Sequence, residues 1–521
     1  MRWLMPRRRA AAALALLPLL LASAGCRAPS RPPPAWTVVP PWVGPGAAAT
    51  LTPEATATLH PLQALMPPTR GPGEPFLTPT PDPGRPAPTF RTESELYTVR
   101  PGDSLGRIAA RFGVGTQALL AANNLANPDL LYAGQILRIP AQSVRLQGPA
   151  LKLLPDSELV YGPSTALFTT TSFVAERAGY LSRYSEQVEG SLLSGARIVQ
   201  TVALRYSLNP RVLLSLLEHQ SGWVTQTEVA PHTLTYPLGF VTLGYEGLYP
   251  QLAWAADQLN RGYYRWRSGW NGPYVLRDGA AVPPGTGINA ATAGVQNALA
   301  LLYPEAEWRE AVGEAGWAQT HARLFGNPFD LAVEPLVPTG LQQPEMQLPF
   351  EPGAVWSFTS GPHGAYASGS AWAALDFGPP GDALGCVPSE AWVTAVADGL
   401  ILRAEQGEVL LDLDGDGYEG TGWVVYFLHI ETRDRVAAGT WVHAGDRIGH
   451  PSCEGGVSTG THVHIARKYN GEWIAADSAM SFVMDGWVPA VSRFEYDGLL
   501  RRAGVVLEAC ACRSERNQIA R

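Results

Sequence analysis

The stretch Ser458-Thr459-Gly460-Thr461-His462-Val463-His464-Ile465-Ala466 decides the architecture of the C-terminal part of this 521-residue chain. After a turn of small residues, Val463 and Ile465 alternate with His462 and His464, which is the period-two pattern of a β-strand. Successive side chains of a strand point to opposite faces, so both histidines share one face and both aliphatic side chains face a core. Two neutral imidazoles on one face can serve one zinc site, one as a ligand and one beside it. For a bare His-x-His, a pair of exposed strand histidines is the simpler alternative.

Three further motifs precede this stretch. They are Gly361-Pro362-His363, Ala374-Leu375-Asp376-Phe377 and Tyr426-Phe427-Leu428-His429-Ile430, with the small landmarks Val396-Ala397-Asp398-Gly399 and Ala444-Gly445-Asp446-Arg447-Ile448-Gly449 between them. With these motifs in this order, residues from about 350 to 490 resemble the lysostaphin-type zinc metallopeptidases, which cut the peptide part of bacterial peptidoglycan. Four ordered motifs are a far more specific signal than a single match.

The resemblance implies a set of metal ligands. The commoner His-x-x-x-Asp pattern of the family is absent, because Trp372 stands four residues before Asp376 and tryptophan cannot bind zinc. The staphylolysin-like branch has twelve residues between the two ligands, and His363 and Asp376 match that spacing. The implied zinc ligands are therefore His363, Asp376 and His464, with one coordination position left open.

The resemblance also implies two catalytic histidines beside the metal. Carried over by motif, His429 and His462 are the base and the transition-state stabiliser. His443 and His450 compete as ligands only by proximity in the sequence, and we expect them to be surface loop residues. The alternative is a degenerate member that only binds the wall or activates another hydrolase. Such members usually lack a ligand, whereas here every position has a candidate.

Residues 94–141 predict a small separate domain. A strand at residues 96–99 precedes a turn and a helix, and a second helix then leads to a strand at 135–140. This strand–helix–helix–strand order resembles a LysM domain, a family that binds glycans containing N-acetylglucosamine in a groove between two loops. By position, the resemblance implicates Gly102, Asp103 and Ser104 in one loop, and Asn127 and Asp129 in the other.

Residues 151–335 predict a mostly helical domain. The segment from Leu213 to Trp223 weakly resembles the catalytic helix of lysozyme-like lytic transglycosylases. That family has a glutamate immediately before Ser-Gly, but this chain has Gln220, and an amide cannot act as the general acid. Glu218 is rotated by about 200° around the helix and cannot take its place. We therefore expect a lysozyme-like domain that can hold glycan but does not cut it.

The first 26 residues predict an export signal, because a basic segment precedes an apolar run too short for a permanent membrane span. The end of this segment, Leu21-Ala22-Ser23-Ala24-Gly25-Cys26, resembles a bacterial lipobox. We favour a lipoprotein signal peptide, with lipidation of Cys26 anchoring the protein in the membrane. Ala22-Ser23-Ala24 also offers an ordinary cleavage site, which would give a secreted protein. Either route places the chain outside the cytoplasm.

Proline-rich segments separate these units. Residues 27–93 form a Pro/Ala/Thr-rich linker, residues 336–352 form a second Pro-rich linker, and residues 491–521 are expected to form a C-terminal tail. In the peptidase domain, at 353–490, short runs of β-forming residues predict an antiparallel sheet. The expected class is multidomain α+β, with a LysM domain (βααβ), a mostly α lysozyme-like middle domain and an antiparallel β-sheet metallopeptidase domain.

Charge and cysteine content restrict the partners and the compartment. The 38 basic and 46 acidic residues give a net charge of −8, which leaves no basic face for a nucleic acid. Cys386, Cys453, Cys510 and Cys512 remain once Cys26 is lipidated, and export permits disulfides. Three pairings are possible, and we predict Cys386–Cys453 because both lie in peptidase loops.

An acidic segment, Asp412-Leu413-Asp414-Gly415-Asp416-Gly417, opens like a calcium-binding loop. Position twelve of such a loop carries a bidentate carboxylate, but this chain has Trp423 there. An acidic hairpin is therefore the favoured interpretation.

Overall fold

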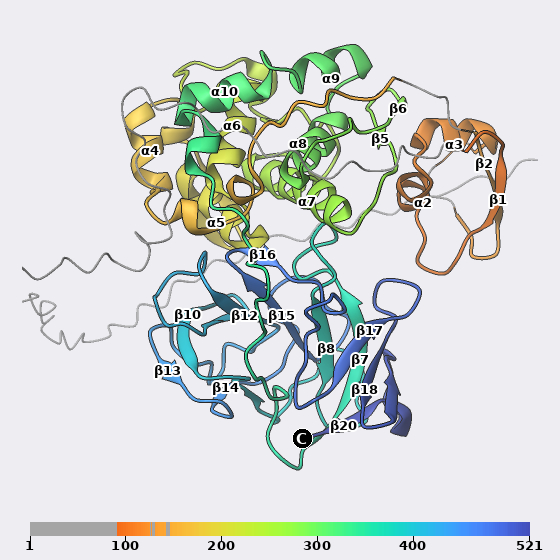
Figure 1. Cartoon of the computed structure of the whole chain (residues 1–521), viewed down its shortest axis with the longest axis vertical. Coiled ribbons are helices and arrows are strands. Elements are labelled where there is room, and N and C mark those ends of the chain that lie inside the picture. The colour runs from red at the N-terminus through yellow and green to blue at the C-terminus, as the bar shows by residue number, and fades with distance from the viewer. Residues whose placement is uncertain (1–90, 126, 128–130, 142–145) are drawn as a thin grey trace, which may run out of the picture. The chain divides into compact units, whose positions relative to one another are not determined.

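The computed structural model describes residues 91–521 except 126, 128–130 and 142–145 (Figure 1). The predicted signal peptide, residues 27–90 of the first linker, the lipidation site Cys26 and the glycan-contact candidate Asp129 lie outside the described residues. No helix in the described part of the chain combines the length and apolar character needed to cross a membrane.

The small N-terminal domain has the predicted βααβ order. Its elements are β1 (Glu95–Thr98), α2 (Leu105–Phe112), α3 (Thr116–Ala122) and β2 (Ile136–Ile139). The two strands pair antiparallel, with Glu95 opposite Ile139. Leu105, Ile108 and Leu119 from the helices pack against alternate residues of the strands in one small core.

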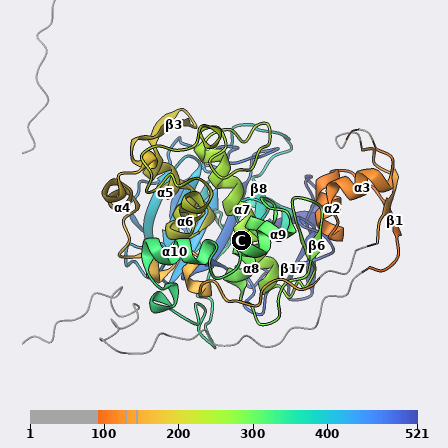
Figure 2. The ribbon, with the colours of Figure 1, turned by 90° about the horizontal axis from the view of Figure 1, so that it is seen from above.

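The middle region is mostly helical. Its helices are α4 (Thr170–Arg177), α5 (Gly195–Tyr206), α6 (Pro210–Ser221), α7 (Leu248–Arg267), α8 (Ala290–Ala300), α9 (Glu305–Ala311) and α10 (Trp317–Phe325), with short hairpins of β3 (Ser185–Val188) with β4 (Ser191–Ser194) and β5 (Tyr274–Val275) with β6 (Ala281–Val282). Asn209 caps α6, its side chain accepting a hydrogen bond from the Arg211 amide, and Pro210 occupies the first helical turn. The helix ends at Gly222, which is left-handed with φ 70°. α10 packs beside α6 (Figure 2).

Glycines set the closest helix contact of this region. A Cβ on Gly262 in α7 would lie 2.5 Å from the Ala293 carbonyl oxygen, and one on Gly294 in α8 would lie 2.8 Å from the Leu259 carbonyl oxygen. The two helices can approach this closely only because neither position carries a side chain.

The C-terminal region contains a nine-stranded antiparallel sheet with the order β13-β10-β11-β12-β15-β8-β7-β20, and β16 pairs with β15 off this path. The strands are β7 (Val355–His363), β8 (Ala374–Gly378), β10 (Gly399–Glu405), β11 (Glu408–Asp412), β12 (Trp423–Leu428), β13 (Trp441–Val442), β15 (Val463–Tyr469), β16 (Glu472–Trp473) and β20 (Gln518–Ala520). Smaller sheets join β9 (Val393–Thr394) with β14 (Arg447–Gly449), and β17 (Val488–Val491) with β18 (Gly498–Arg502) and β19 (Val505–Glu508). The predicted multidomain α+β class is confirmed.

Both faces of the large sheet are buried at β12, where successive side chains point into two different cores. Val425 and Phe427 pack into a core within the sheet region, whereas Val424 and Tyr426 belong to the core of the helical region. Hydrogen bonds cross the same contact, such as the 3.0 Å bond from the Trp473 amide to the Tyr264 hydroxyl. The helical region therefore covers one face of the sheet.

The C-terminal residues differ from the expectation of a tail. Residues 491–521 contribute β18, β19 and β20, and β20 pairs with β7, placing the buried Ile519 opposite Trp356. The predicted Cys386–Cys453 disulfide is present, and Cys510 and Cys512 form a second one. The acidic segment joins β11 to β12, as expected of a hairpin.

Candidate metal centre

Three adjacent strands bring the expected ligands together. His363 ends β7, Asp376 lies in β8 and His464 lies in β15, directly opposite Asp376 in the register of the two strands. All three side chains are buried, and their ligand atoms all lie within 4.8 Å of one another. Side chains more than a hundred residues apart in sequence thus converge because the strand order places β8 between β7 and β15.

Main-chain carbonyls fix the orientation of the two imidazoles. His363 Nδ1 lies 2.9 Å from the Gly361 carbonyl oxygen, and His464 Nε2 lies 2.9 Å from the Ala365 carbonyl oxygen. A carbonyl oxygen only accepts, so each of these nitrogens carries the hydrogen. The other two nitrogens, His363 Nε2 and His464 Nδ1, lie 3.0 Å apart, and Asp376 Oδ1 is 3.3 Å from the first and 3.1 Å from the second.

The neutral imidazoles thus direct two bare nitrogens at each other and at a carboxylate. A proton or a metal ion must lie between such groups. Burial alone would lower the pKa of His363, but the Asp376 carboxylate raises it. Burial raises the pKa of Asp376, but the imidazoles of His363 and His462 outweigh this and hold it well below its usual range. Two imidazoles and one carboxylate form a donor set that suits zinc.

His429 and His462 flank this group. His429 directly follows β12, His462 directly precedes β15, and their ring centroids are 4.4 Å apart. His462 Nε2 lies 3.6 Å from Asp376 Oδ2. Each Nδ1 donates to a carbonyl oxygen, that of Glu454 at 2.9 Å for His429 and that of Gly460 at 2.7 Å for His462. Burial, aided by His462 and His464, lowers the pKa of His429 to about 3, so its Nε2 is a free acceptor at neutral pH.

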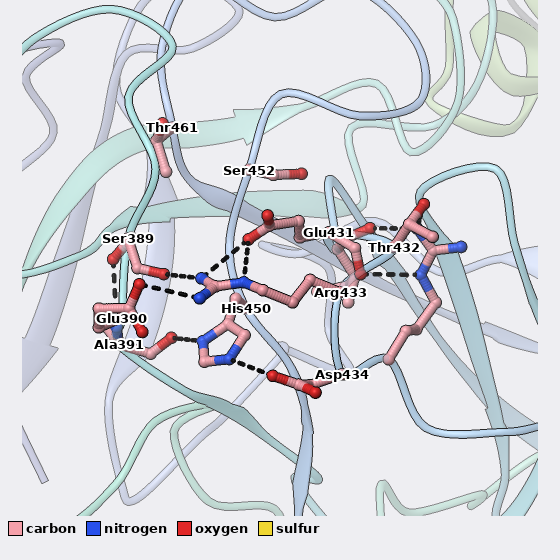
Figure 3. Close-up of polar contacts among 12 residues, drawn as sticks. Ser389, Glu390, Ala391, Glu431, Thr432, Arg433, Asp434, His450, Ser452 and Thr461 are labelled. Atoms are coloured by element: carbon pink, nitrogen blue, oxygen red, sulfur yellow. Dashed lines mark hydrogen bonds and ion pairs between the residues drawn. The ribbon is translucent and has the colours of Figure 1, made fainter.

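The other two histidines of this region lie apart from the metal group. His443 is exposed and contacts Asp398, as expected of a surface residue. The expectation that His450 is a surface residue is wrong. Its ring is buried under Trp392, with centroids 3.9 Å apart. The ring also contacts the Ala391 carbonyl oxygen at 2.8 Å and Asp434 at 3.5 Å (Figure 3). The sequence around His450 gives no sign of Trp392, which lies far away along the chain.

Figure 3 also shows the contacts of Arg433 with residues 389 and 390 and with Glu431. Arg433 donates to Glu390 at 2.9 Å, to the Ser389 carbonyl oxygen at 3.0 Å and to Glu431 at 3.2 Å. The segment that follows His429 is therefore held to the segment around residue 390, which lies next to the groove described below.

The metal group lies in a groove of about 1150 Å³. Leu384 and Val457 are exposed apolar residues at its wall, and Tyr206 from α5 of the helical region also lines it. Two further lining residues, Tyr496 and Arg513, come from the segment expected to be a tail. The Tyr496 ring stacks on His363, with centroids 4.7 Å apart. Sequence reasoning missed both residues because they lie outside the motifs.

The glycan-contact candidates of the small domain lie in its first turn and beyond α3. Gly102 has φ 84°, and the Asp103 carboxylate accepts from the Tyr97 hydroxyl at 2.6 Å and from the Arg100 amide at 2.8 Å. Asp103 therefore stabilises this turn. Ser104 accepts from the Arg107 amide at 3.3 Å, and Asn127 is exposed. Their glycan contacts stay predictions.

The Glu218 carboxylate of the helical region forms hydrogen bonds with the segment that follows α6 and an ion pair with α10. Its carboxylate accepts from the Val224 and Thr225 amides at 3.1 Å each and contacts Arg323 at 3.2 Å. This agrees with the expectation that Glu218 does not replace the missing acid at Gln220.

Comparisons with known proteins agree with this arrangement. The family described as LasA, N-terminal domain matches residues 152–338, and the LysM domain family matches residues 97–140. Protease LasA of Pseudomonas aeruginosa is 29% identical over 375 residues, which cover 68% of this chain and 81% of that protein. The chain is similar to this protease over most of its length. The expected resemblance is thereby confirmed, whereas the lysozyme-like character of the helical region stays a prediction.

The solved structures that match this chain are less similar to it than Protease LasA is. The M23 metalloprotease pseudoalterin, described as from the deep sea, is 23% identical with a TM-score of 0.29 and covers 34% of this chain and 99% of its own. The catalytic domain of lysostaphin from Staphylococcus simulans is 21% identical with a TM-score of 0.17 and covers 23% of this chain and 87% of its own. Such TM-scores carry no argument by themselves.

Proposed function

We propose that this chain is an exported zinc-dependent endopeptidase that hydrolyses peptide cross-links of bacterial peptidoglycan. The observation that carries the proposal is the convergence of His363 Nε2, His464 Nδ1 and Asp376 within 4.8 Å in the wall of a large groove. The likeness to Protease LasA supports a peptidase, and the LysM match supports attachment to glycan strands.

The residues of the groove divide the chemistry between them. His363, Asp376 and His464 would hold the metal, which when bound supplies a Lewis acid and an acidified water. His429 keeps its Nδ1 hydrogen on the Glu454 carbonyl oxygen, so its Nε2 can accept a proton from a nucleophilic water. His462 lies beside it, and we assign it the second catalytic role, stabilisation of the developing oxyanion.

The N-terminal units would bring this groove to the wall. We propose that the LysM domain binds glycan strands and that lipidation of Cys26 anchors the chain in the membrane, with residues 27–93 as a spacer. Ordinary cleavage after Ala24 would instead release the same enzyme from the cell.

A degenerate wall-binding or hydrolase-activating protein is the rival function. Such a protein does not need a buried carboxylate flanked by two imidazoles with bare nitrogens, and burying such a group without a cation is costly. The complete donor set therefore favours the enzyme.

The decisive experiment is digestion of purified peptidoglycan by the purified chain. We expect new peptide amino termini, identified by mass spectrometry, that disappear with a chelator and return when zinc is added. The Asp376→Ala variant is the matched negative control. A zinc-loaded chain that binds peptidoglycan but releases no new termini would support the rival function.

A further inference from the structure

An unpaired arginine lies in the wall of the catalytic groove. Arg513 lines both this groove and a neighbouring cavity of about 430 Å³, and Thr461 also lines both. The Arg513 Nε atom is buried without a hydrogen-bond partner, and the guanidinium forms no ion pair with any described residue. Burial lowers the pKa of Arg513, and the negative charge of Asp382 opposes this effect.

Strand β8 places the guanidinium on the face that carries the metal ligands. A Cβ on Gly378 would lie 1.8 Å from Arg513 Nη1 and 2.7 Å from its Cζ, so only glycine leaves room for this group. Gly378 follows Asp376 by two residues in the same strand, so both positions face the same side of the sheet. Two residues along a strand span about 7 Å, which is close to the length of two residues of an extended peptide substrate.

The segment that carries Arg513 is held rigidly. Cys510 and Cys512 are joined by a disulfide. The fully buried Asn517 side chain donates to the carbonyl oxygens of Phe358, Cys510 and Cys512 at 3.1 Å each. The cross-link and these hydrogen bonds fix the main chain immediately before Arg513, so the cation is held in place before any ligand arrives.

We propose that Arg513 is an anion-binding residue of the groove that binds a carboxylate of the peptide substrate. The inference rests on the proposed function and specifies its substrate as an acidic peptide, with a free carboxylate within about two residues of the cleaved bond. A guanidinium suits this ligand because its planar donors can form two parallel hydrogen bonds with a carboxylate. The exposed Asp382, whose charge raises the pKa of Arg513, is the competing carboxylate.

The test compares two versions of one cross-linked peptide that the wild-type chain cleaves. In the second version, the carboxylate nearest the cleaved bond is converted to a carboxamide. We expect kcat/KM of the wild type to be about 10-fold higher or more for the carboxylate form, as for a hydrogen-bonded charged pair. In R513Q this preference should fall to about 1, with the rate on the carboxamide form and the zinc content unchanged.

Further variants separate binding from a structural role. R513K should keep part of the preference, D382N should increase it, and R516Q, an exposed arginine of the same segment, should leave it unchanged. An R513Q variant that slows both peptides equally, or a wild type without preference, would overturn the inference while leaving the peptidase intact. A wild type that cleaves no cross-linked peptide would contradict the proposed function itself, and the inference with it.

Discussion

At the scale of single residues, each histidine of the site is oriented by one main-chain carbonyl. Gly361 and Ala365 orient the two imidazoles of the candidate metal centre, and Glu454 and Gly460 orient the two flanking ones. A carbonyl that accepts from one ring nitrogen leaves the other nitrogen bare and aimed at the metal site or the groove. The direction in which the other ring nitrogen of each histidine points is therefore set by the segment that supplies the carbonyl.

This division of roles predicts different outcomes for the two pairs. His363→Ala, Asp376→Ala and His464→Ala should each lose zinc, because removing one of three protein ligands leaves too few. His429→Ala and His462→Ala should retain about one zinc per chain and lose about 100-fold or more in kcat. Metal analysis after dialysis, together with turnover, checks both. Full zinc content and full activity in His363→Ala would show that the ligand assignment is wrong.

Glu454, whose main-chain carbonyl orients His429, is held through its side-chain carboxylate by Arg435. The Arg435 side chain is buried and contacts the Glu454 carboxylate at 2.7 Å and the Ile430 carbonyl oxygen at 2.7 Å, and the Thr432 amide also donates to Glu454 at 2.8 Å. These contacts fix the two segments on either side of the His429 ring.

Arg435→Met should therefore lower kcat by about 10-fold through loss of His429 orientation, with zinc content unchanged. Arg433→Met is the matched control, because Arg433 lies on the same segment but pairs with the exposed Glu390 and the half-buried Glu431 (Figure 3). The milder Glu454→Gln keeps the side-chain shape and should lose less. Equal effects of Arg435→Met and Arg433→Met would argue against a specific orienting role.

The motifs could predict which three side chains converge but not their surroundings. His363, Asp376 and His464 stand in ordered sequence patterns, so the resemblance was enough to select them. Tyr496 stacks on His363 from a segment far away along the chain, and its contact depends on the pairing of β17 with β18. Such contacts follow from the packed fold and have no local periodicity that a sequence pattern could reveal.

At the scale of elements, α6 and α10 meet at a buried histidine. His321 of α10 is fully buried, and its Nδ1 lies 2.9 Å from Ser215 Oγ of α6. Burial, with a smaller contribution from Arg211, lowers the pKa of His321 to about 3. The folded chain therefore keeps this imidazole neutral far below the pH at which an exposed histidine takes up a proton.

The lowered pKa predicts acid sensitivity of the helical region. Because an unfolded histidine titrates near about 6.5, only the unfolded state takes up this proton as the pH falls from there toward 3. The free energy of unfolding should decrease over this window, by at most about 1.4 kcal/mol per pH unit from one group. His321→Gln should show a smaller slope of stability against pH in thermal unfolding. The exposed His232 provides the control, since His232→Gln should keep the wild-type slope.

Strands and helices with strong local patterns were predictable, and the last strands were not. The alternation in residues 463–465 matches β15, and the helix predicted after the first turn of the small domain matches α2. The run of β-forming residues at 423–427 lies in β12. The three-residue β20 is too short for a local signal, and it forms because Ile519 is buried opposite Trp356. Its stability comes from tertiary contacts, which the sequence of 518–520 does not display.

At the scale of the whole described chain, the helical region also contacts the loop between β7 and β8, next to the candidate metal site. Residues 364–371 form most of the loop between His363, the last residue of β7, and the start of β8. Ala365 in this loop supplies the carbonyl that orients His464. The Gly369 amide donates to Asp257 of α7 at 2.6 Å, and Arg261 of α7 donates to Ser368 at 2.6 Å. A Cβ on Gly369 would lie 2.0 Å from the Asp257 carbonyl oxygen, so the loop fits closely against the helix.

We therefore expect Asp257 to influence the metal site across the contact between the two regions. Asp257→Ala removes the acceptor for the Gly369 amide, which should loosen residues 364–371 and with them the Ala365 carbonyl that holds His464. Because loss of an outer hydrogen-bond partner of a metal-bound histidine typically weakens binding, zinc affinity should fall by about 10-fold, measured by competition with a chelator.

Asp257→Asn retains an oxygen acceptor and should restore most of the affinity. Asp278→Ala changes an exposed aspartate of the same region and should have no effect. If Asp257→Ala bound zinc as tightly as the wild type, the carbonyl of Ala365 would be held by the sheet region alone, and the helical region would have no part in forming the metal site.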